Sequence, residues 1–131
     1  MKEKEMVDAI RHIGIPTKDL EASVAFYELL GFSVDRRIDC GPAGDRIAFM
    51  AAGNCTIELY ECPDAVGVNG PIDHMTLNAT NLEAAYEQLT SRGYTVLEGA
   101  MQTLPSFDGG VKFFSVRGPN GEKVELEAAC N

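Results

Sequence analysis

The chain contains one internal duplication, and this repeat restricts the possible fold more than any other feature. Residues 11–34 align with residues 73–96 without a gap, at an offset of 62. The identical pairs are His12 with His74, Leu20 with Leu82, Glu21 with Glu83, Ala22 with Ala84, Gly31 with Gly93 and Val34 with Val96. A copy of about 60 residues buries little core alone, so two copies are expected to pair, within one chain or between chains.

Each copy begins with the signals of a strand followed by a helix. In the first copy, Ile13 and Ile15 alternate with residues of the other face, which indicates a strand with one apolar face. Asp19 stands at a helix N-cap position, because its side chain can accept hydrogen bonds from free N–H groups of the first turn. Gly31 stands at the helix end, where a left-handed backbone favours glycine. The second copy repeats these signals at Met75, Leu77, Asn81 and Gly93.

Further strands are expected after each helix. The segments GFSV and GYTV directly follow the two helices. Two hairpins come next, the first around Gly53-Asn54 and the second around Asn120-Gly121, because such pairs favour the positive φ angles of tight turns. The predicted hairpin strands are residues 46–52 with 55–61, and residues 111–117 with 122–128.

The order β-α-β-β-β therefore occurs twice. We expect an α+β fold, in which two tandem βαβββ modules form curved mixed sheets around a metal-binding cleft. The first module is predicted at residues 8–62 and the second at residues 72–129, and together they make one domain. The segment CPDAVGVNGP, residues 62–71, is the expected linker.

The repeat also places polar residues at equivalent positions. Side chains alternate between the faces of a strand, so Glu58 is expected opposite its apolar neighbours Ile57 and Leu59. Applied to both copies, this alternation points four side chains away from the helices, near a pseudo-twofold axis: His12, Glu58, His74 and Glu125. A single His or Glu on a strand is more often a structural or surface residue. The metal-binding interpretation rests on the recurrence of the pair in both copies.

Two imidazoles and two carboxylates form a mixed nitrogen and oxygen ligand set. Such a set suits zinc, nickel, cobalt, iron(II) or manganese, and it disfavours copper(I), which prefers sulfur. Four protein ligands on a six-coordinate ion leave positions for water or substrate, as Lewis-acid catalysis requires. One divalent metal ion per site is therefore expected.

Composition excludes several classes of partner. With 11 basic and 20 acidic residues, the chain has a formal net charge of −9, which repels nucleic acid. No apolar run approaches the roughly 18 residues of a membrane span, and the charged start MKEKEMVD lacks the apolar region of a secretory signal. A cytoplasmic location is expected. The four cysteines form no CxxC pair, so reduced thiols are expected rather than disulfides or a zinc site.

The segments IRHIGIPTKDLEASVAFYELLGF, TIELYE, IDHMTL and RGPNGEKVELE resemble the vicinal oxygen chelate superfamily. This superfamily includes glyoxalase I, methylmalonyl-CoA epimerase, extradiol dioxygenases, and fosfomycin and bleomycin resistance proteins. The ligand set is most similar to that of bacterial glyoxalase I. That resemblance implies nickel, zinc or cobalt held by His12, Glu58, His74 and Glu125, with Glu58 or Glu125 moving the proton. It also implies a homodimer, in which His12 and Glu58 of one chain complete a site with His74 and Glu125 of its partner. A site formed by both modules of one chain is the alternative.

The activity implied by this resemblance is that of a lyase. It converts the hemithioacetal of a 2-oxoaldehyde to a 2-hydroxyacyl thioester through an enediolate, so a small molecule, possibly a thiol adduct, is the expected partner. Pro16 and Cys62 stand where glyoxalases often have arginine and asparagine, so the thiol stays open. A methylmalonyl-CoA epimerase-like enzyme and a non-catalytic drug- or metabolite-binding protein are the alternatives. With two histidines, the chain departs from the usual dioxygenase pattern.

Two further groups of residues are candidates for substrate contacts. Basic residues that could hold an anionic substrate include Arg36, Arg37, Arg46, Lys112 and Arg117, with Lys112 weakly preferred. The loop that contains Phe107, Gly109 and Gly110 is a candidate lid over the cleft.

Overall fold

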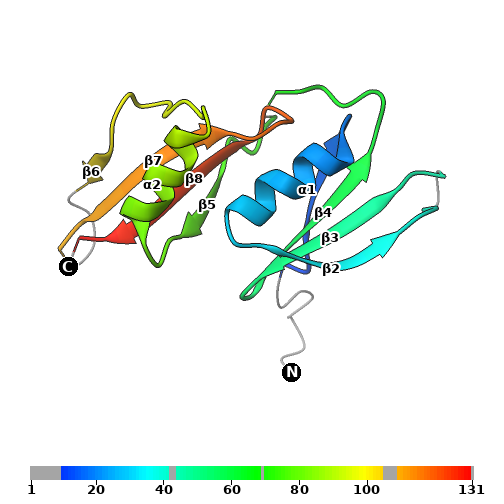
Figure 1. Cartoon of the computed structure of the whole chain (residues 1–131), viewed down its shortest axis with the longest axis horizontal. Helices are drawn as coiled ribbons and strands as arrows, with labels where there is room; N and C mark the ends of the chain where they lie inside the picture. The colour runs from blue at the N-terminus through cyan, green and yellow to red at the C-terminus, as the bar shows by residue number, and fades with distance from the viewer. Residues whose placement is uncertain (1–9, 42–43, 69, 105–108, 131) are drawn as a thin grey trace, which may run out of the picture. The chain divides into compact units, whose positions relative to one another are not determined.

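The structure, a computed structural model, describes residues 10–41, 44–68, 70–104 and 109–130. The chain divides into two compact units, Met1–Ala65 and Val66–Asn131. Within the described residues, each unit contains one helix and one four-stranded sheet (Figure 1). All described elements of the two units fall inside the module bounds proposed from the sequence, residues 8–62 and 72–129.

The first unit consists of five elements. They are β1 (Ile13–Thr17), α1 (Leu20–Leu29), β2 (Ser33–Ile38), β3 (Ile47–Ala52) and β4 (Cys55–Glu61). The strand order in the sheet is β1-β4-β3-β2, in which β1 runs parallel to β4 and the other neighbours are antiparallel. The sheet is therefore mixed, and the strand that begins the unit lies beside the strand that ends it.

The second unit repeats this arrangement. Its elements are β5 (Met75–Asn78), α2 (Leu82–Ser91), β6 (Gln102–Leu104), β7 (Val111–Arg117) and β8 (Lys123–Ala129). The strand order is β5-β8-β7-β6, again with a parallel pair of first and last strands. The α+β fold class and the two βαβββ modules are therefore confirmed.

Both helices begin and end as the sequence predicts. The Asp19 side chain accepts a hydrogen bond from the Ala22 N–H at 3.1 Å, and the Asn81 side chain accepts one from Ala84 at 3.1 Å. Gly31 and its repeat counterpart adopt positive φ angles after the helices. These caps satisfy backbone groups that the helix cannot pair internally, so local sequence alone fixes the helix bounds.

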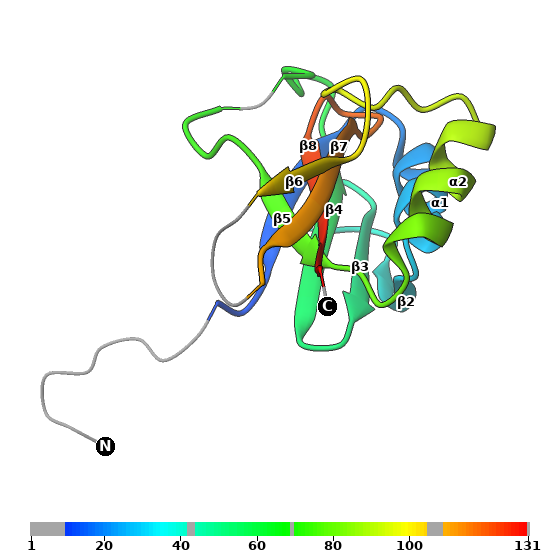
Figure 2. The same cartoon turned by 90° about the vertical axis from the view of Figure 1, so that its left-hand side faces the viewer.

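In each unit the helix covers one face of its own sheet (Figure 2). In the first unit, Met50, Ile57 and Leu59 have no exposed surface and lie on the face that α1 covers. In the second unit, Tyr86 of α2 packs edge-on against Phe114 of β7, with ring centroids 5.0 Å apart. Apolar burial under the helix is the main stabilising contribution in each unit, and it leaves the opposite face for polar residues.

The predicted strand GYTV, at residues 93–96, is wrong. These residues form no strand, and the strand that lies beside β7 is the later β6. The Glu98 side chain accepts the backbone N–H of Ser115 at 2.8 Å, in place of a backbone carbonyl of a neighbouring strand. Gly99 then turns the chain with φ +86°. Beside Ser115 the chain thus combines one backbone bond, from the Leu97 N–H to the Ser115 carbonyl at 2.9 Å, with this side-chain acceptor, and the paired strand begins only at β6.

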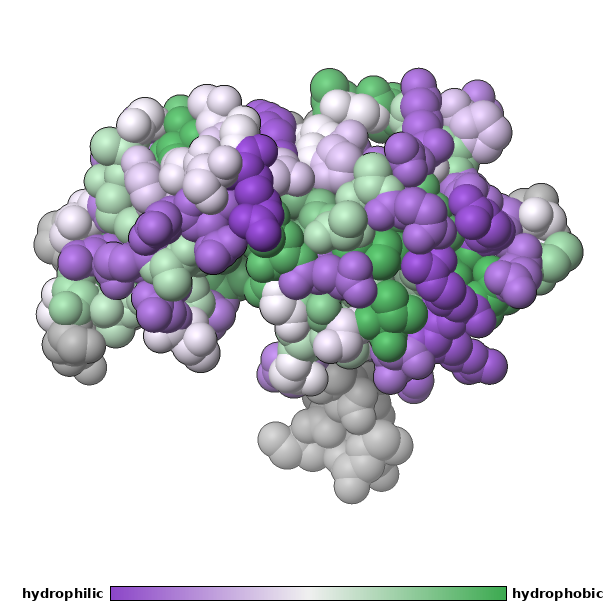
Figure 3. Space-filling view, viewed as in Figure 1, coloured by the Kyte–Doolittle hydropathy of each residue, from purple (hydrophilic) through white to green (hydrophobic). Residues whose placement is uncertain are grey.

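Strand β2 is the outer strand of the first sheet, and most of its side chains are exposed. Figure 3 shows hydrophilic side chains gathered over this strand. Charged side chains on an edge strand disfavour pairing with the edge of another chain. No helix within the described part of the chain is long and apolar enough to cross a membrane.

Candidate metal centre

The first unit brings His12 and Glu58 into contact. His12 directly precedes β1, and Glu58 lies in β4 in register with Gly14 of β1 and Phe49 of β3. Nε2 of His12 lies 3.3 Å from Oε1 of Glu58, and both side chains are part-exposed. The imidazole also meets the Phe49 ring edge-on at 5.6 Å. As the alternation predicts, Glu58 lies on the face opposite the apolar side chains that α1 covers.

The second unit contains the equivalent pair. His74 directly precedes β5, and its Nε2 lies 3.8 Å from Oε2 of Glu125 in β8. The Thr76 hydroxyl donates a hydrogen bond to Oε1 of Glu125 at 3.3 Å. The Glu125 side chain is 16% exposed, against 24% for Glu58 in the first unit. The carboxylate of this unit is therefore more buried than its counterpart and has one further polar contact.

Asp73 is a functional candidate that the repeat did not indicate. Its Oδ2 lies 2.9 Å from Nδ1 of His74 and 3.5 Å from the ammonium of Lys123. The hydrogen bond with His74 and the charge of Lys123 hold the pKa of the Asp73 carboxyl below its usual value. A carboxylate on Nδ1 directs Nε2 of the same ring toward a metal. The equivalent residue of the first copy is Arg11, so the repeat could not indicate Asp73. The available sequence signal was a carboxylate directly next to a candidate histidine ligand.

The geometry of each pair suits neighbouring ligands of a single ion. With metal–ligand bonds of about 2.1 Å, adjacent ligands lie about 3.0 Å apart in an octahedral site and about 3.4 Å apart in a tetrahedral site. The observed separations, 3.3 Å and 3.8 Å, are close to these values. In neither unit do the described residues gather three or more His, Cys, Asp or Glu side chains as a metal site. Each unit thus contributes one His–Glu pair.

Three of the basic candidates have structural partners. Arg37 forms a two-pronged ion pair with Glu21 of α1, with both nitrogen–oxygen distances at 3.0 Å. Arg46 bonds Glu61 at 2.8 Å and also approaches Glu21. The hydrogen bonds from Arg37 and Arg46 lower the pKa of the Glu21 and Glu61 carboxyls respectively. Arg117 donates to the backbone carbonyl of the β7–β8 turn. These contacts join elements within a unit.

Lys112 lies on the helix face of its sheet. It shares that face with Phe114, two residues along β7, and its ammonium is 4.0 Å from Glu83 of α2. Glu125 lies on the opposite face, in register with Ser115. The prediction that Lys112 contacts the substrate is therefore wrong. The alternation of side chains along β7 places Lys112 on the face that α2 covers, opposite the face of Glu125.

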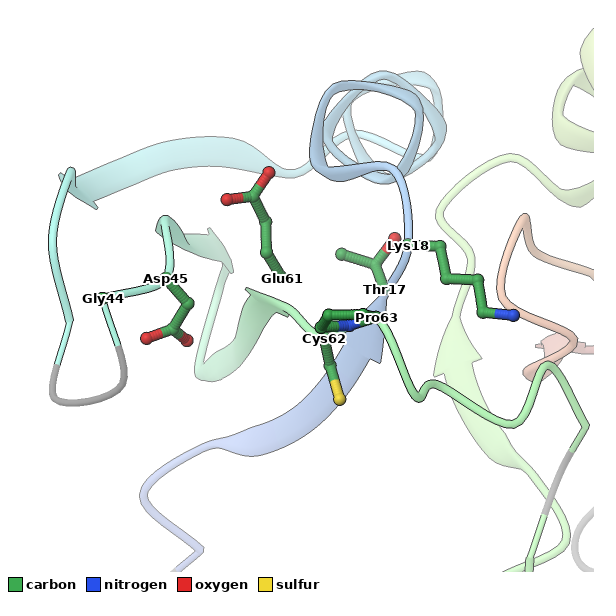
Figure 4. A pocket seen from close by; sticks show the side chains of 7 residues that line it. All are labelled: Thr17, Lys18, Gly44, Asp45, Glu61, Cys62 and Pro63. Carbon is green, nitrogen blue, oxygen red and sulfur yellow. The ribbon is translucent and has the colours of Figure 1, made fainter.

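Two surface hollows occur in the first unit. One, of about 390 Å³, includes His12 together with Ile13, Asn54, Cys55 and Thr56, at the start of β1 and β4. The other, of about 400 Å³, lies at the far ends of these strands. Figure 4 shows that the side chains of the second hollow point in different directions, and its Glu61 is already bonded to Arg46. Of these two hollows, the one at the start of β1 and β4 includes a candidate metal ligand.

The four cysteines are free. Cys40 is exposed, the other three are part-buried, and burial raises the pKa of the Cys55 thiol, which disfavours the reactive thiolate. In the candidate lid, Gly109 and Gly110 have positive φ angles, whereas Phe107 lies outside the described residues.

The family model of the Glyoxalase/Bleomycin resistance protein/Dioxygenase superfamily matches residues 9–126. The chain belongs to this superfamily. The resemblance to vicinal oxygen chelate proteins is thereby confirmed across both modules. A relative in Bacillus subtilis (strain 168), the uncharacterised protein YwbC, is 28% identical over 126 residues, which cover 92% of this chain and 98% of the relative.

Solved structures of the superfamily share the fold. A glyoxalase family protein from Bacillus cereus matches with a TM-score of 0.76 and 17% identity, over 98% of each chain. A protein from Agrobacterium tumefaciens named lactoylglutathione lyase matches with a TM-score of 0.67 and 18% identity, over 93% of this chain and 94% of that one. At these identities the likeness shows the fold alone.

Proposed function

We propose that this superfamily member is a metal-dependent, glyoxalase I-like lyase. It would convert the hemithioacetal of a 2-oxoaldehyde to a 2-hydroxyacyl thioester. The observation that carries the proposal is the His–Glu pair at equivalent places in both units, with nitrogen–oxygen separations of 3.3 Å and 3.8 Å. The fold shared with a protein named lactoylglutathione lyase supports it.

The proposed ligands of a divalent ion, nickel, zinc or cobalt, are His12, Glu58, His74 and Glu125. The donor set of two imidazoles and two carboxylates fits these ions. When bound, such an ion would stabilise negative charge that develops on the substrate oxygens. Asp73 would orient His74 so that its Nε2 stays directed toward the site.

A carboxylate of this set would move the proton. The reaction removes a proton from the carbon that carries sulfur and returns a proton to the adjacent carbon, so no external oxidant is needed. The Thr76 hydroxyl donates a hydrogen bond to Glu125. Among the described residues, the only polar partner of the Glu58 carboxylate is His12. Glu58 is therefore the better candidate for the mobile base, and Glu125 for the fixed ligand.

The test is an activity assay with a matched control. The protein, loaded in turn with nickel, cobalt or zinc, is given the hemithioacetals of methylglyoxal with several thiols. Glu125→Gln is expected to lower kcat/KM by about a hundredfold or more, because it removes a ligand carboxylate. Glu127→Gln, two residues along the same face of β8, is expected to keep wild-type activity. Equal activity of the two variants would refute the proposed role of Glu125.

A second candidate is an acyl-thioester epimerase that uses the same proton transfer. The segment HIGIPTKDLE resembles methylmalonyl-CoA epimerases, which often have glutamine where Glu58 stands. Pro16 and Cys62, at the positions where glyoxalases often have arginine and asparagine, argue against glutathione as the thiol. Racemisation of a 2-methylacyl-CoA without turnover of any hemithioacetal would select it. A protein that only sequesters a drug or metabolite would hold no stoichiometric metal.

We further propose that the enzyme acts as a homodimer in the cytoplasm.

A further inference from the structure

Strand β2 contains a β-bulge that decides where its two adjacent arginines point. Val34 pairs with Met50 of β3. The next pair is Arg36 with Phe49, which leaves Asp35 as an extra residue in β2. Such a bulge redirects the side chains that follow it. Because directly paired residues share a face of the sheet, Arg36 lies on the face of Phe49, opposite α1.

The neighbouring arginine confirms this orientation. Arg37 pairs with the buried Ala48 and reaches Glu21 of α1, so it lies on the helix face. Arg36 is exposed, and it has no hydrogen-bond or ion-pair partner among the residues that the structure describes. An arginine without a partner keeps its donors available for a ligand anion.

Arg36 shares a cross-strand row with the candidate metal ligand of its unit. Arg36 pairs with Phe49, and Phe49 pairs with Glu58. Two strand spacings separate the outer members of this row, which places their Cα atoms about 10 Å apart. The Phe49 ring lies between them and meets the His12 imidazole. A small molecule held at the His12–Glu58 pair would therefore lie over Phe49, with its far end within reach of the guanidinium.

The second unit differs at this position. The repeat aligns Arg36 with Glu98, at the same offset of 62. The Glu98 carboxylate accepts hydrogen bonds from the backbone and hydroxyl of Ser115, and Ser115 is in register with Glu125. One copy of the repeat thus carries, in the row of its Glu58, a cation that has no partner among the described residues, and the other carries a carboxylate that is already bonded. The difference favours an anionic group at the first unit only.

We infer that Arg36 determines substrate specificity by binding an anionic group of the substrate, at the end remote from the reacting carbons. This inference rests on the proposed function for the place of the reacting carbons. The guanidinium takes a carboxylate or a phosphate oxygen through charge-assisted hydrogen bonds. Substrates that lack an anion at this end bind more weakly.

The test compares three small thiols of different charge in the metal-loaded enzyme. Their hemithioacetals with methylglyoxal carry a carboxylate (3-mercaptopropionate), a neutral hydroxyl (3-mercaptopropanol) or a quaternary ammonium (thiocholine). Arg36→Ala is expected to raise KM about tenfold for the carboxylate substrate alone, with kcat nearly unchanged, as for a contact made equally in ground and transition states. Coenzyme A as the thiol tests phosphate instead, and a similar rise in KM for it alone would identify phosphate as the anion.

The matched control is Arg37→Ala, which removes the adjacent arginine on the other face and is expected to leave every KM unchanged. Arg36→Lys keeps the charge and is expected to restore part of the preference. KM values that Arg36→Ala leaves unchanged for all four thiols, or raises equally for all of them, would overturn the inference.

A binding measurement separates this inference from the proposed activity. 3-(Methylthio)propanoate and 3-(methylthio)propanol are unreactive probes that differ only in the anion, and their binding is followed by ligand-observed NMR. Weaker binding of the propanoate to Arg36→Ala than to wild type, with the propanol unaffected, supports the anion site even if no hemithioacetal turns over. Equal binding of the propanoate to both proteins rejects the site even if turnover is observed.

Discussion

Glu98 accepts two hydrogen bonds from Ser115. Its carboxylate accepts the Ser115 backbone N–H at 2.8 Å and the Ser115 hydroxyl at 2.6 Å, and Ser115 is completely buried. Partial burial raises the pKa of the Glu98 carboxyl, but the hydrogen bonds with Ser115, together with the charge of Lys123, outweigh this effect and hold the pKa below its usual value. A depressed pKa in the folded state means that the ionised carboxylate stabilises the fold.

This contact predicts a pH dependence of stability. The Glu98 contribution is fully present above the unfolded-state pKa, about 4.5, and is lost as the pH falls through the lower folded-state pKa. Glu98→Gln is therefore expected to show a less steep loss of the free energy of unfolding between about pH 5 and about pH 3. Urea unfolding at several pH values across this range measures the free energy of unfolding of each protein. Glu87→Gln, an exposed helix residue, should keep the wild-type slope, and an equal slope in all three proteins would contradict the prediction.

At the scale of the elements, the helices and hairpins could be predicted from local residues. Asp19, Asn81 and the turn glycines each satisfy a backbone requirement within a few residues of themselves, so sequence was enough. The segment GYTV was mispredicted because Glu98, beyond its end, takes the N–H that a strand would have bonded. The bulge that turns Arg36 depends on pairing with β3, and such a register cannot be read from β2 alone.

The β7–β8 turn offers a test of close packing between backbone segments. Gly121 has φ +81°, and a Cβ at this residue would collide with the backbone of Gly67. Gly99 has a similar φ of +86° but open space around it. Gly99→Ala is expected to cost about 1 kcal/mol of unfolding free energy, and Gly121→Ala at least about 2 kcal/mol, because only the second adds a steric clash. Denaturant unfolding of both variants measures this, and equal losses would refute the proposed clash.

At the scale of the whole molecule, the duplication explains both the fold and the candidate site. Each copy of the repeat forms a sheet in which a histidine directly before the first strand lies beside a carboxylate of the last strand. Sequence predicted these four residues because they recur at equivalent positions. It missed Asp73, whose counterpart in the first copy is an arginine. It also could not distinguish Arg37, which is ion-paired, from Arg36, which has no partner among the described residues.

The central proposal is that the two His–Glu pairs bind one ion together. Metal content after loading with nickel and desalting tests it directly. One ion per chain is expected for the wild type. His12→Ala and His74→Ala are each expected to lose the ion, and Glu127→Gln is expected to retain it. Two ions per chain in the wild type, or full retention after His74→Ala, would contradict a shared site.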